Sequence, residues 1–358
     1  MISVILGTRP EIIKMSPIIR ELEGRGLEFS IIHTGQHYSY EMDRIFFKEL
    51  ELPLPDINLD VGSGTQADQT GRMLPKIERV LLDQRSDVAL VQGDTNTVLA
   101  GALAAAKLGI PVGHVEAGLR SYDRTMPEEI NRVLADHIST HLYAPTEESR
   151  ENLAREGIFH GVFVTGNTIV DAAFQNMDIS KAKSHPLKDL DIEPNNYFLV
   201  TAHRQENVDN KDRLSGMIRG LENISEREDM PMIFTAHPRT RKMLKAFDIK
   251  VNNIQIIEPV GYLDFLQLEA NARLVLTDSG GVQEETCILR TPCVTLRDNT
   301  ERPETVTAGS NILAGVDPKR IMEAAEQMMV RGREWENPYG DGYASVRIVN
   351  LINELLDS

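Results

Sequence analysis

The chain has 358 residues, more than one hydrophobic core usually covers, so its length predicts two domains. Its formal net charge of −16 excludes general affinity for nucleic acid, which requires a basic face, but permits one anionic small molecule where cations converge. No apolar run approaches the length of a membrane span, so no membrane partner is expected. Only Cys287 and Cys293 are cysteines, which excludes a disulfide scaffold and fits a reducing cytoplasm.

Short β-rich runs alternate with helical stretches along most of the chain. The first series of predicted strands covers 2–7, 28–34, 87–93, 111–116, 142–145 and 162–165, and the second covers 197–202, 232–237, 254–258, 274–277 and 292–296. Helical segments include 10–25, 95–108, 210–224 and 343–356. This order predicts an α/β fold in which parallel sheets are covered by helices on both faces.

The alternation lapses between the two series. The stretch 181–196 is polar and contains Pro186 and Pro194, which is typical of a connection between domains. We therefore predict an N-terminal domain over 1–170, a linker region over 171–196 and a C-terminal domain over 197–342.

Ligands of open parallel sheets bind beyond the carboxyl ends of the strands, so the residues after each strand carry the functional prediction. After the first strand come Arg9 and Lys14, at the start of a helix. Two cations at a helix N-terminus are typical of an anion site. The same pattern also fits a capped helix with two solvated cations, and this stretch alone favours neither.

Two later strands are each followed by a carboxylate, Asp94 and Glu116. Asp94 alone fits a helix N-cap, and Glu116 alone fits an exposed loop acid. Neighbouring parallel strands would bring both acids to one rim, which favours a functional role. Glu128 lies in a third acidic cluster, where Pro127 and two glutamates also fit an ordinary helix start. Together the clusters offer carboxylates for general acid–base chemistry.

In the second half, His203 and His237 each follow a strand. A single histidine in such a place is often structural, and two parallel instances favour a ligand-binding role. No histidine–acid pair has the spacing of a zinc motif such as H-E-x-x-H, so no metal is predicted.

The strongest local signal is a buried strand that ends in Ser279, Gly280 and Gly281, where a helix begins. The glycines let a phosphate approach the backbone N–H groups at the helix start. Glu285, about one turn later, is placed to accept hydrogen bonds from ribose hydroxyls. Arg302 follows another strand, and its planar guanidinium suits diphosphate oxygens.

A set of motifs occurs in order along the chain: Gly7-Thr-Arg-Pro-Glu11, Gly93-Asp-Thr95, His114-Val-Glu-Ala-Gly-Leu-Arg120, Pro127-Glu-Glu129, Thr165-Gly-Asn167, Thr277-Asp-Ser-Gly-Gly281, Gln283-Glu-Glu285, Thr300-Glu-Arg-Pro-Glu304 and Asn337-Pro-Tyr-Gly-Asp-Gly342. Across essentially the whole chain they resemble the non-hydrolysing UDP-N-acetylglucosamine 2-epimerases. Met126 stands where many bacterial members have tryptophan, and the stretch 36–40 also differs from the bacterial form. These departures bear on regulation and exact substrate rather than on reaction type.

The resemblance implies a GT-B-like architecture: two Rossmann-like domains with parallel sheets facing a central cleft, and a C-terminal helix, 343–358, that crosses back to the first domain. It implies reversible interconversion of UDP-N-acetylglucosamine and UDP-N-acetylmannosamine. The route is anti elimination of UDP to 2-acetamidoglucal, followed by re-addition, with no nicotinamide or other cofactor. Family members are usually homodimers.

The resemblance also implies roles for individual residues. The catalytic set matches Asp94, Glu116 and Glu128, together with His203. The substrate contacts match Arg9, Lys14, His203, Phe265, Ser279, Gly280, Gly281, Glu285 and Arg302, alongside Asp94 and Glu116. Some members are regulated by a second substrate molecule, for which Gln36, Gln69, Arg204 and His237 are the candidates here.

Other functions fit the same fold, because fold alone does not decide function. They are a 2-epimerase for a related UDP-sugar such as a 3-acetamido uronic acid derivative, a hydrolysing 2-epimerase, a GT-B glycosyltransferase, and a non-catalytic UDP-sugar sensor. Three carboxylates at the rim of the first domain favour epimerisation, since a sensor has no use for them.

Overall fold

Runs of aliphatic residues form the central strands and are buried along their whole length, as expected when helices cover both faces of a parallel sheet. β1 (Ile2–Leu6), β4 (Val88–Gln92) and β11 (Leu274–Thr277) are buried at every position. The computed structural model describes residues 1–36 and 40–357, so residues 37–39 of the stretch 36–40 lie outside the described residues. The chain divides into unit 1, Met1–Gln175 with Tyr339–Ser358, and unit 2, Asn176–Pro338.

Unit 1 is built on a seven-stranded parallel sheet of order β3-β2-β1-β4-β5-β6-β7. Its other strands are β2 (Phe29–His33), β3 (Ile57–Asn58), β5 (Val112–Val115), β6 (His141–Ala144) and β7 (Val162–Val164). Its helices are α1 (Arg9–Gly24), α2 (Tyr40–Glu49), α3 (Gln66–Gln84), α4 (Asn96–Lys107), α5 (Pro127–Ile138), α6 (Glu147–Arg155), most of α7 (Thr168–Lys183), and α16 (Ala344–Leu356).

Unit 2 repeats this plan with a six-stranded parallel sheet of order β10-β9-β8-β11-β12-β13. Its other strands are β8 (Phe198–Thr201), β9 (Met232–Thr235), β10 (Gln255–Ile257), β12 (Cys293–Thr295) and β13 (Asn311–Leu313). Its helices are α8 (Pro186–Asp189), α9 (Gln205–Val208), α10 (Lys211–Glu228), α11 (Pro238–Ala246), α12 (Tyr262–Asn271), α13 (Gly280–Ile288), α14 (Pro303–Ala308) and α15 (Pro318–Val330).

In both sheets the strand order reverses beside the first strand of the unit. β1 lies between β2 and β4, and β8 lies between β9 and β11. The crossover that leaves β1 runs to β2, whereas the one that leaves β4 runs to β5 on the opposite side, and β8 and β11 diverge in the same way toward β9 and β12. The loops after β1 and β4, and those after β8 and β11, therefore meet at a topological switch point in each unit. Most of the residues predicted to carry function follow these four strands or β5.

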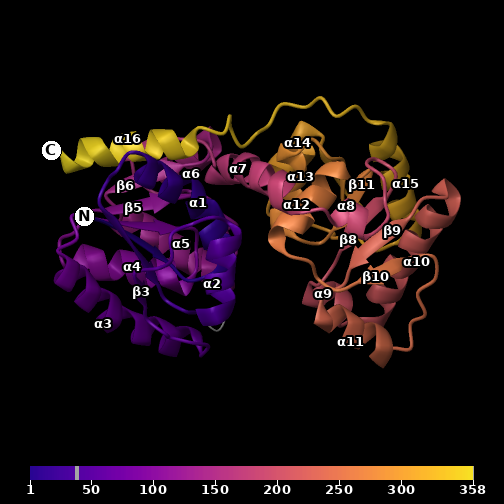
Figure 1. Cartoon of the computed structure of the whole chain (residues 1–358), viewed down its shortest axis with the longest axis horizontal. Helices are drawn as coiled ribbons and strands as arrows, with labels where there is room; N and C mark the ends of the chain where they lie inside the picture. Colours follow the sequence, from indigo (N-terminus) through magenta and orange to yellow (C-terminus); the bar gives the residue numbers. More distant parts are fainter. Residues whose placement is uncertain (37–39, 358) are drawn as a thin grey trace. The chain divides into compact units, whose positions relative to one another are not determined.

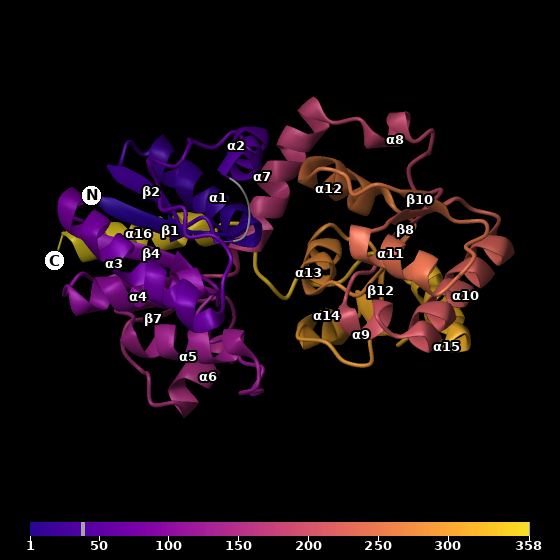
Figure 2. The same ribbon diagram turned by 90° about the horizontal axis from the view of Figure 1, so that it is seen from below.

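Helices pack on one another within each unit. In unit 1, α3 packs on α4, and in unit 2, α10 packs on α15, as Figure 2 shows. The C-terminal helix α16 packs on α1 of unit 1 (Figure 1). Asp171 of α7 anchors the start of α16 by accepting hydrogen bonds from the backbone N–H groups of Ala344 (3.2 Å) and Ser345 (2.8 Å).

Every strand predicted from the sequence is present, with its ends shifted by at most two residues. β3 and β13 were not predicted, because two and three residues carry too little periodicity to be recognised. α7 runs through the first half of the segment 171–196, and the division between the units falls within this helix. In the described part of the chain, no helix combines the length and apolarity needed to cross a membrane.

Candidate functional site

The carboxylate of Glu116 is held at both oxygens where β5 ends. Lys14 on α1 donates to Oε1 at 2.5 Å, and Asn167 donates to the same oxygen at 3.4 Å. Gln92, the last residue of β4, donates to Oε2 at 2.5 Å. Glu116 has a left-handed backbone, with φ of 71°. A non-glycine residue rarely adopts this conformation, and such residues gather at functional sites.

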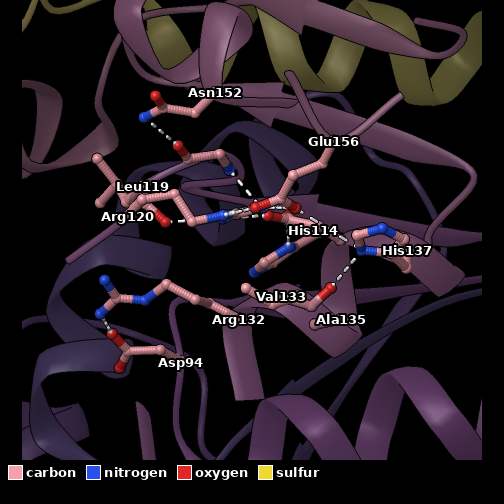
Figure 3. Close-up of polar contacts among 12 residues, drawn as sticks. Asp94, His114, Leu119, Arg120, Arg132, Val133, Ala135, His137, Asn152 and Glu156 are labelled. Carbon is pink, nitrogen blue, oxygen red and sulfur yellow. Dashed lines mark hydrogen bonds and ion pairs between the residues drawn. The ribbon is translucent and has the colours of Figure 1, made fainter. Parts of the chain in front are cut away.

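Asp94 lies in the turn that follows the neighbouring strand β4. Its carboxylate forms an ion pair with Arg132 of α5 (Figure 3). Asn131 donates to the Asp94 carbonyl oxygen at 2.9 Å, so α5 holds both the backbone and the side chain of Asp94. A Cβ atom at Gly93 would lie 3.7 Å from Oε2 of Glu116, which brings the two acidic turns side by side, as the strand order predicts.

Two adjacent glutamates lie in the first turn of α5 and differ in burial. Glu129 is buried and accepts hydrogen bonds from the backbone N–H groups of Ser121 (2.9 Å) and Tyr122 (3.0 Å), so it fixes the preceding loop. Glu128 is exposed. Of the pair, Glu128 is the one whose side chain is open to solvent, and its catalytic role stays a prediction.

The helix start after β1 is organised around Glu11, which sequence analysis did not single out. Its Oε2 accepts hydrogen bonds from the backbone N–H groups of Gly7 and Thr8, each at 2.7 Å. Its Oε1 accepts from the hydroxyl of Thr95 at 2.5 Å, linking the turns after β1 and β4. The Arg9 guanidinium lies 5.6 Å from the ring centroid of Phe46. Of the two predicted phosphate-binding cations, Lys14 is thus paired with Glu116, and Arg9 stacks on an aromatic ring.

Glu11 gives the free energy of unfolding a predicted pH dependence. Burial raises the pKa of Glu11 from 4.5 to about 7, although the hydrogen bonds from Thr95, Gly7 and Thr8 oppose the shift. Between these pH values the unfolded chain releases a proton that the folded chain keeps. The contribution of Glu11 to the free energy of unfolding is therefore fully present below pH 4.5. It falls by roughly 3 kcal/mol as the pH rises to about 7.

Glu11→Gln keeps the shape and removes the titration. Urea unfolding at the two ends of this pH window is expected to show a shallower pH dependence for Glu11→Gln than for the native chain. Equal pH dependence in both proteins would contradict the assignment.

Gln36 and Gln69, the predicted regulatory residues of unit 1, are buried in an amide and hydroxyl network. Gln69 donates to the carbonyl oxygens of Gln36 (2.9 Å) and Gly62 (3.0 Å), and accepts from Asn96 at 2.8 Å. Thr97 donates to the Gln36 side chain at 2.8 Å. The network ties the loop after β2 to the start of α4, and contact with a second ligand stays a prediction.

Asp278 is the hub of the unit 2 switch point. It is fully buried directly after β11, and its carboxylate accepts hydrogen bonds from the backbone N–H groups of His203 (3.0 Å) and Arg204 (3.0 Å) and from the Asn207 amide (3.1 Å). The imidazole Nδ1 of His203 lies 3.6 Å from Oδ1. Asp278 thus fixes the loop after β8, which presents His203 to solvent.

His203 is uncharged at neutral pH in this setting. Partial burial of the ring lowers its pKa, and the nearby charges of His237 and Arg204 lower it further, against the opposing charge of Asp278. The rings of His203 and His237 have centroids 6.0 Å apart. Arg204 and His237, the other predicted regulatory residues, therefore lie beside His203. A neutral imidazole suits hydrogen bonding to a ligand rather than ion pairing.

Helix α13 begins at Gly280, with Ser279 as its N-cap. The Ser279 side chain makes no cap hydrogen bond, so it does not satisfy the N–H groups of the first turn. Gly281 is exposed, and a Cβ atom there would have only the Ser279 hydroxyl oxygen nearby, at 4.0 Å. These features fit the predicted approach of an anion to this helix start.

Arg302 lies beside the same helix, where its Nε donates to Oε1 of Glu284 at 2.6 Å. Glu285 is buried, close to Glu269 and Tyr262. Glu269 is 0% exposed, and neither of its oxygens has a hydrogen-bond partner among the described residues. Burial, and then the charge of Glu285, raise the pKa of Glu269 well above its ordinary value.

The structure thus brings Lys14, Asp94 and Glu116 together in unit 1, and His203, Arg204 and His237 together in unit 2. Phe265 lies on α12, partly buried against the core that includes Tyr197 and Leu199. Glu11, Gln92, Asn167 and Asp278 are the polar anchors that sequence analysis missed as individual residues. Three of them lie inside the ordered motifs, so motif membership was the available signal.

Comparison with known proteins identifies the group to which the chain is similar. A family model described as UDP-N-acetylglucosamine 2-epimerase matches residues 20–353. The UDP-N-acetylglucosamine 2-epimerase of Methanocaldococcus jannaschii is 58% identical, over 98% of this chain and 98% of that protein. The UDP-2,3-diacetamido-2,3-dideoxy-D-glucuronate 2-epimerase of Pseudomonas aeruginosa is 40% identical, over 99% of each chain.

Solved structures agree in fold. The M. jannaschii UDP-GlcNAc 2-epimerase, crystallised in complex with UDP-GlcNAc and UDP, superposes with a TM-score of 0.87 at 57% identity and 99% coverage of each chain. A glycosyltransferase of Rickettsia africae has a TM-score of 0.58 at 12% identity, which shows a shared fold alone. With the family model matched over most of its length, the chain belongs to the UDP-N-acetylglucosamine 2-epimerase family.

Proposed function

We propose that this chain catalyses the reversible interconversion of UDP-N-acetylglucosamine and UDP-N-acetylmannosamine. The observation that carries the proposal is the pair of acidic turns at the unit 1 switch point, where Glu116 is held at both oxygens beside the Gly93–Asp94 turn. Family membership and the identity of 58% to the M. jannaschii enzyme support this substrate over a uronic acid derivative. The P. aeruginosa relative that is named for a uronic acid derivative is 40% identical to this chain.

The chemistry explains why carboxylates are needed. C2 of the sugar bears no activating carbonyl, so direct proton removal there is very unfavourable. In the proposed route a base removes the C2 proton while the bond from C1 to the UDP oxygen breaks, and the electron pair forms the C1=C2 double bond of 2-acetamidoglucal. A proton then reaches C2 from the opposite face and UDP adds back to C1. The route needs proton-transfer groups for both faces and a stabilised leaving group.

We assign proton transfer to Asp94, Glu116 and Glu128 of unit 1. Lys14 is suited to keeping Glu116 ionised, because a cation at 2.5 Å favours the carboxylate. This pairing makes Lys14 a partner of the acid in addition to its predicted contact with the substrate.

We assign stabilisation of the leaving UDP mainly to unit 2. The start of α13, with Ser279, Gly280 and Gly281, supplies backbone N–H groups, and Arg302 supplies a guanidinium. The neutral imidazole of His203 supplies a hydrogen bond. The remaining predicted contacts are Glu285 with the ribose, Phe265 with the nucleoside and Arg9 with the phosphates.

Regulation and assembly extend the proposal. Gln36, Gln69, Arg204 and His237 remain candidates for contact with a second substrate molecule. A homodimer and a cytoplasmic location are predictions, which size-exclusion chromatography with light scattering and cell fractionation would test.

The test is a proton NMR time course with UDP-N-acetylglucosamine and no acceptor. Appearance of UDP-N-acetylmannosamine at a constant total of UDP-sugar is the expected result. Free UDP with N-acetylmannosamine would indicate a hydrolysing enzyme, and an unchanged substrate would indicate a transferase or a sensor. A parallel reaction with UDP-2,3-diacetamido-2,3-dideoxy-D-glucuronate is expected to be slower, and a faster one would reassign the substrate.

A further inference from the structure

Behind the acidic turns of unit 1 lies a buried charged cluster that the proposed chemistry does not use. His114 of β5 and Asp136 of α5 are both buried, and His114 Nδ1 lies 2.7 Å from Oδ1 of Asp136. Arg120 pairs with Asp136 at 2.7 Å and donates twice to Glu156, each time at 2.8 Å. Figure 3 shows His114, Arg120 and Glu156 lying close together, with Asp94 and its partner Arg132 nearby.

The hydrogen bonds determine the protonation of His114. Its Nε2 lies 2.8 Å from the carbonyl oxygen of Gly93, which can only accept, so Nε2 carries a proton. Oδ2 of Asp136 accepts from the Gly118 backbone N–H at 3.1 Å and pairs with the Arg120 guanidinium, contacts that require a carboxylate. Nδ1 therefore donates to Asp136, and both ring nitrogens carry protons.

The surrounding charges keep the imidazolium charged. Burial lowers the pKa of His114, but the charge and hydrogen bond of Asp136, the Gly93 carbonyl and the charge of Glu116 together raise it above its ordinary value. Burial raises the pKa of Asp136, and His114 and Arg120 outweigh that effect, so it is lowered. Arg120 also lowers the pKa of Glu156. Positive and negative groups thus alternate through the cluster.

The contact with Gly93 joins the ends of β4 and β5 at the acidic turns. Gly93 has a left-handed backbone, with φ of 86°, and it immediately precedes Asp94. Its carbonyl is held by His114, and the next carbonyl, that of Asp94, is held by Asn131. Glu116 lies two residues beyond His114 on the same strand end.

Stability alone does not explain such a cluster, because well-packed apolar residues can often replace buried ion pairs without loss of stability. We propose that His114 is a positioning residue of the epimerisation, whose imidazolium holds the Gly93 carbonyl and thereby fixes the turn that presents Asp94 beside Glu116. The inference rests on the proposed function, which the reaction with UDP-N-acetylglucosamine tests separately.

Two substitutions separate the two contacts of the ring. The amide nitrogen of His114→Gln takes the place of Nε2 and can still donate to Gly93, whereas that of His114→Asn takes the place of Nδ1 and can reach only Asp136. His114→Asn is expected to lower kcat about 100-fold by misplacing the turn, with KM little changed, since His114 does not contact substrate. His114→Gln is expected to stay within about tenfold of the native kcat. His160→Asn, at an exposed histidine of the same unit, is the control and is expected to behave as the native enzyme.

Nitrogen-15 NMR of histidine-labelled enzyme reads the protonation directly, with the His114 signal assigned by its loss in His114→Gln. At pH 6.5, the ordinary histidine pKa, the signal is expected to be predominantly that of a doubly protonated ring, whereas a ring with an unshifted pKa would be half protonated. A neutral ring would overturn the proposal, and so would a native kcat in His114→Asn. Equal losses of kcat in both variants, in proportion to their losses of thermal stability, would also overturn it. If His114→Asn does not fold, a loss beyond tenfold in folded His114→Gln overturns it. A native enzyme inactive on UDP-N-acetylglucosamine would refute the proposed function and remove the positioning role, leaving the charged ring as a structural result.

Discussion

Glu116→Gln is expected to lower kcat for epimerisation by about 10²–10⁴-fold, the range that general acid–base groups supply. Glutamine has nearly the same size and keeps one acceptor oxygen for Lys14, but it cannot take up or return a proton. The amide nitrogen also faces the Gln92 amide that now donates to Oε2. Initial rates of UDP-N-acetylmannosamine formation measure the effect, and KM is expected to change less than kcat because the loss falls on the chemical step.

Glu148→Gln is the matched control for this experiment. Glu148 is an exposed glutamate in the first turn of α6, in the same unit, and its substitution is expected to leave kcat unchanged. A Glu116→Gln enzyme with native kcat would remove Glu116 from the catalytic set. An equal loss in Glu148→Gln would mean that the effect comes from net charge.

Asp278→Asn is expected to destabilise the chain by about 3 kcal/mol and to weaken UDP binding at least about tenfold. The buried carboxylate accepts from three N–H groups, and an asparagine amide would present its own N–H groups to some of them. The loop carrying His203 would lose its anchor, so the contact with the leaving group would be displaced. Urea unfolding measures the stability, and isothermal titration with UDP measures the affinity.

Asp209→Asn provides the contrast within unit 2. Asp209 is exposed and forms a surface ion pair with Arg239, a kind of contact that adds little to stability. Native stability and native UDP affinity are expected for this variant. If Asp278→Asn behaved like Asp209→Asn, the role of Asp278 as anchor of the β8 loop would be wrong.

The sequence was informative about the fold because parallel strands buried on both faces leave continuous aliphatic runs that alternate with helical periodicity. The strand ends were also predictable, and they located Asp94, Glu116, His203 and Ser279 at the switch points. β3 and β13 escaped because such short strands are defined by pairing with β2 and β12 rather than by their own composition.

Pairings between distant segments were beyond sequence reasoning. Lys14 and Glu116 are 102 positions apart, and their ion pair depends on the order of strands in the sheet. Glu128 and Glu129 are identical residues side by side, and only the phase of α5 decides that Glu129 turns inward. Asp278 resembled a simple neighbour of Ser279, yet its role as hub depends on the loop after β8, which passes beside it in the folded unit.

The central claim is that protons enter and leave C2 of the sugar through carboxylates of unit 1. Incubation with UDP-N-acetylglucosamine in deuterium oxide, followed by proton NMR at equilibrium, tests it most directly. We expect the C2 proton signal to disappear from both epimers, with deuterium at C2 and nowhere else on the sugar ring. Interconversion that retains the original C2 proton would contradict the account.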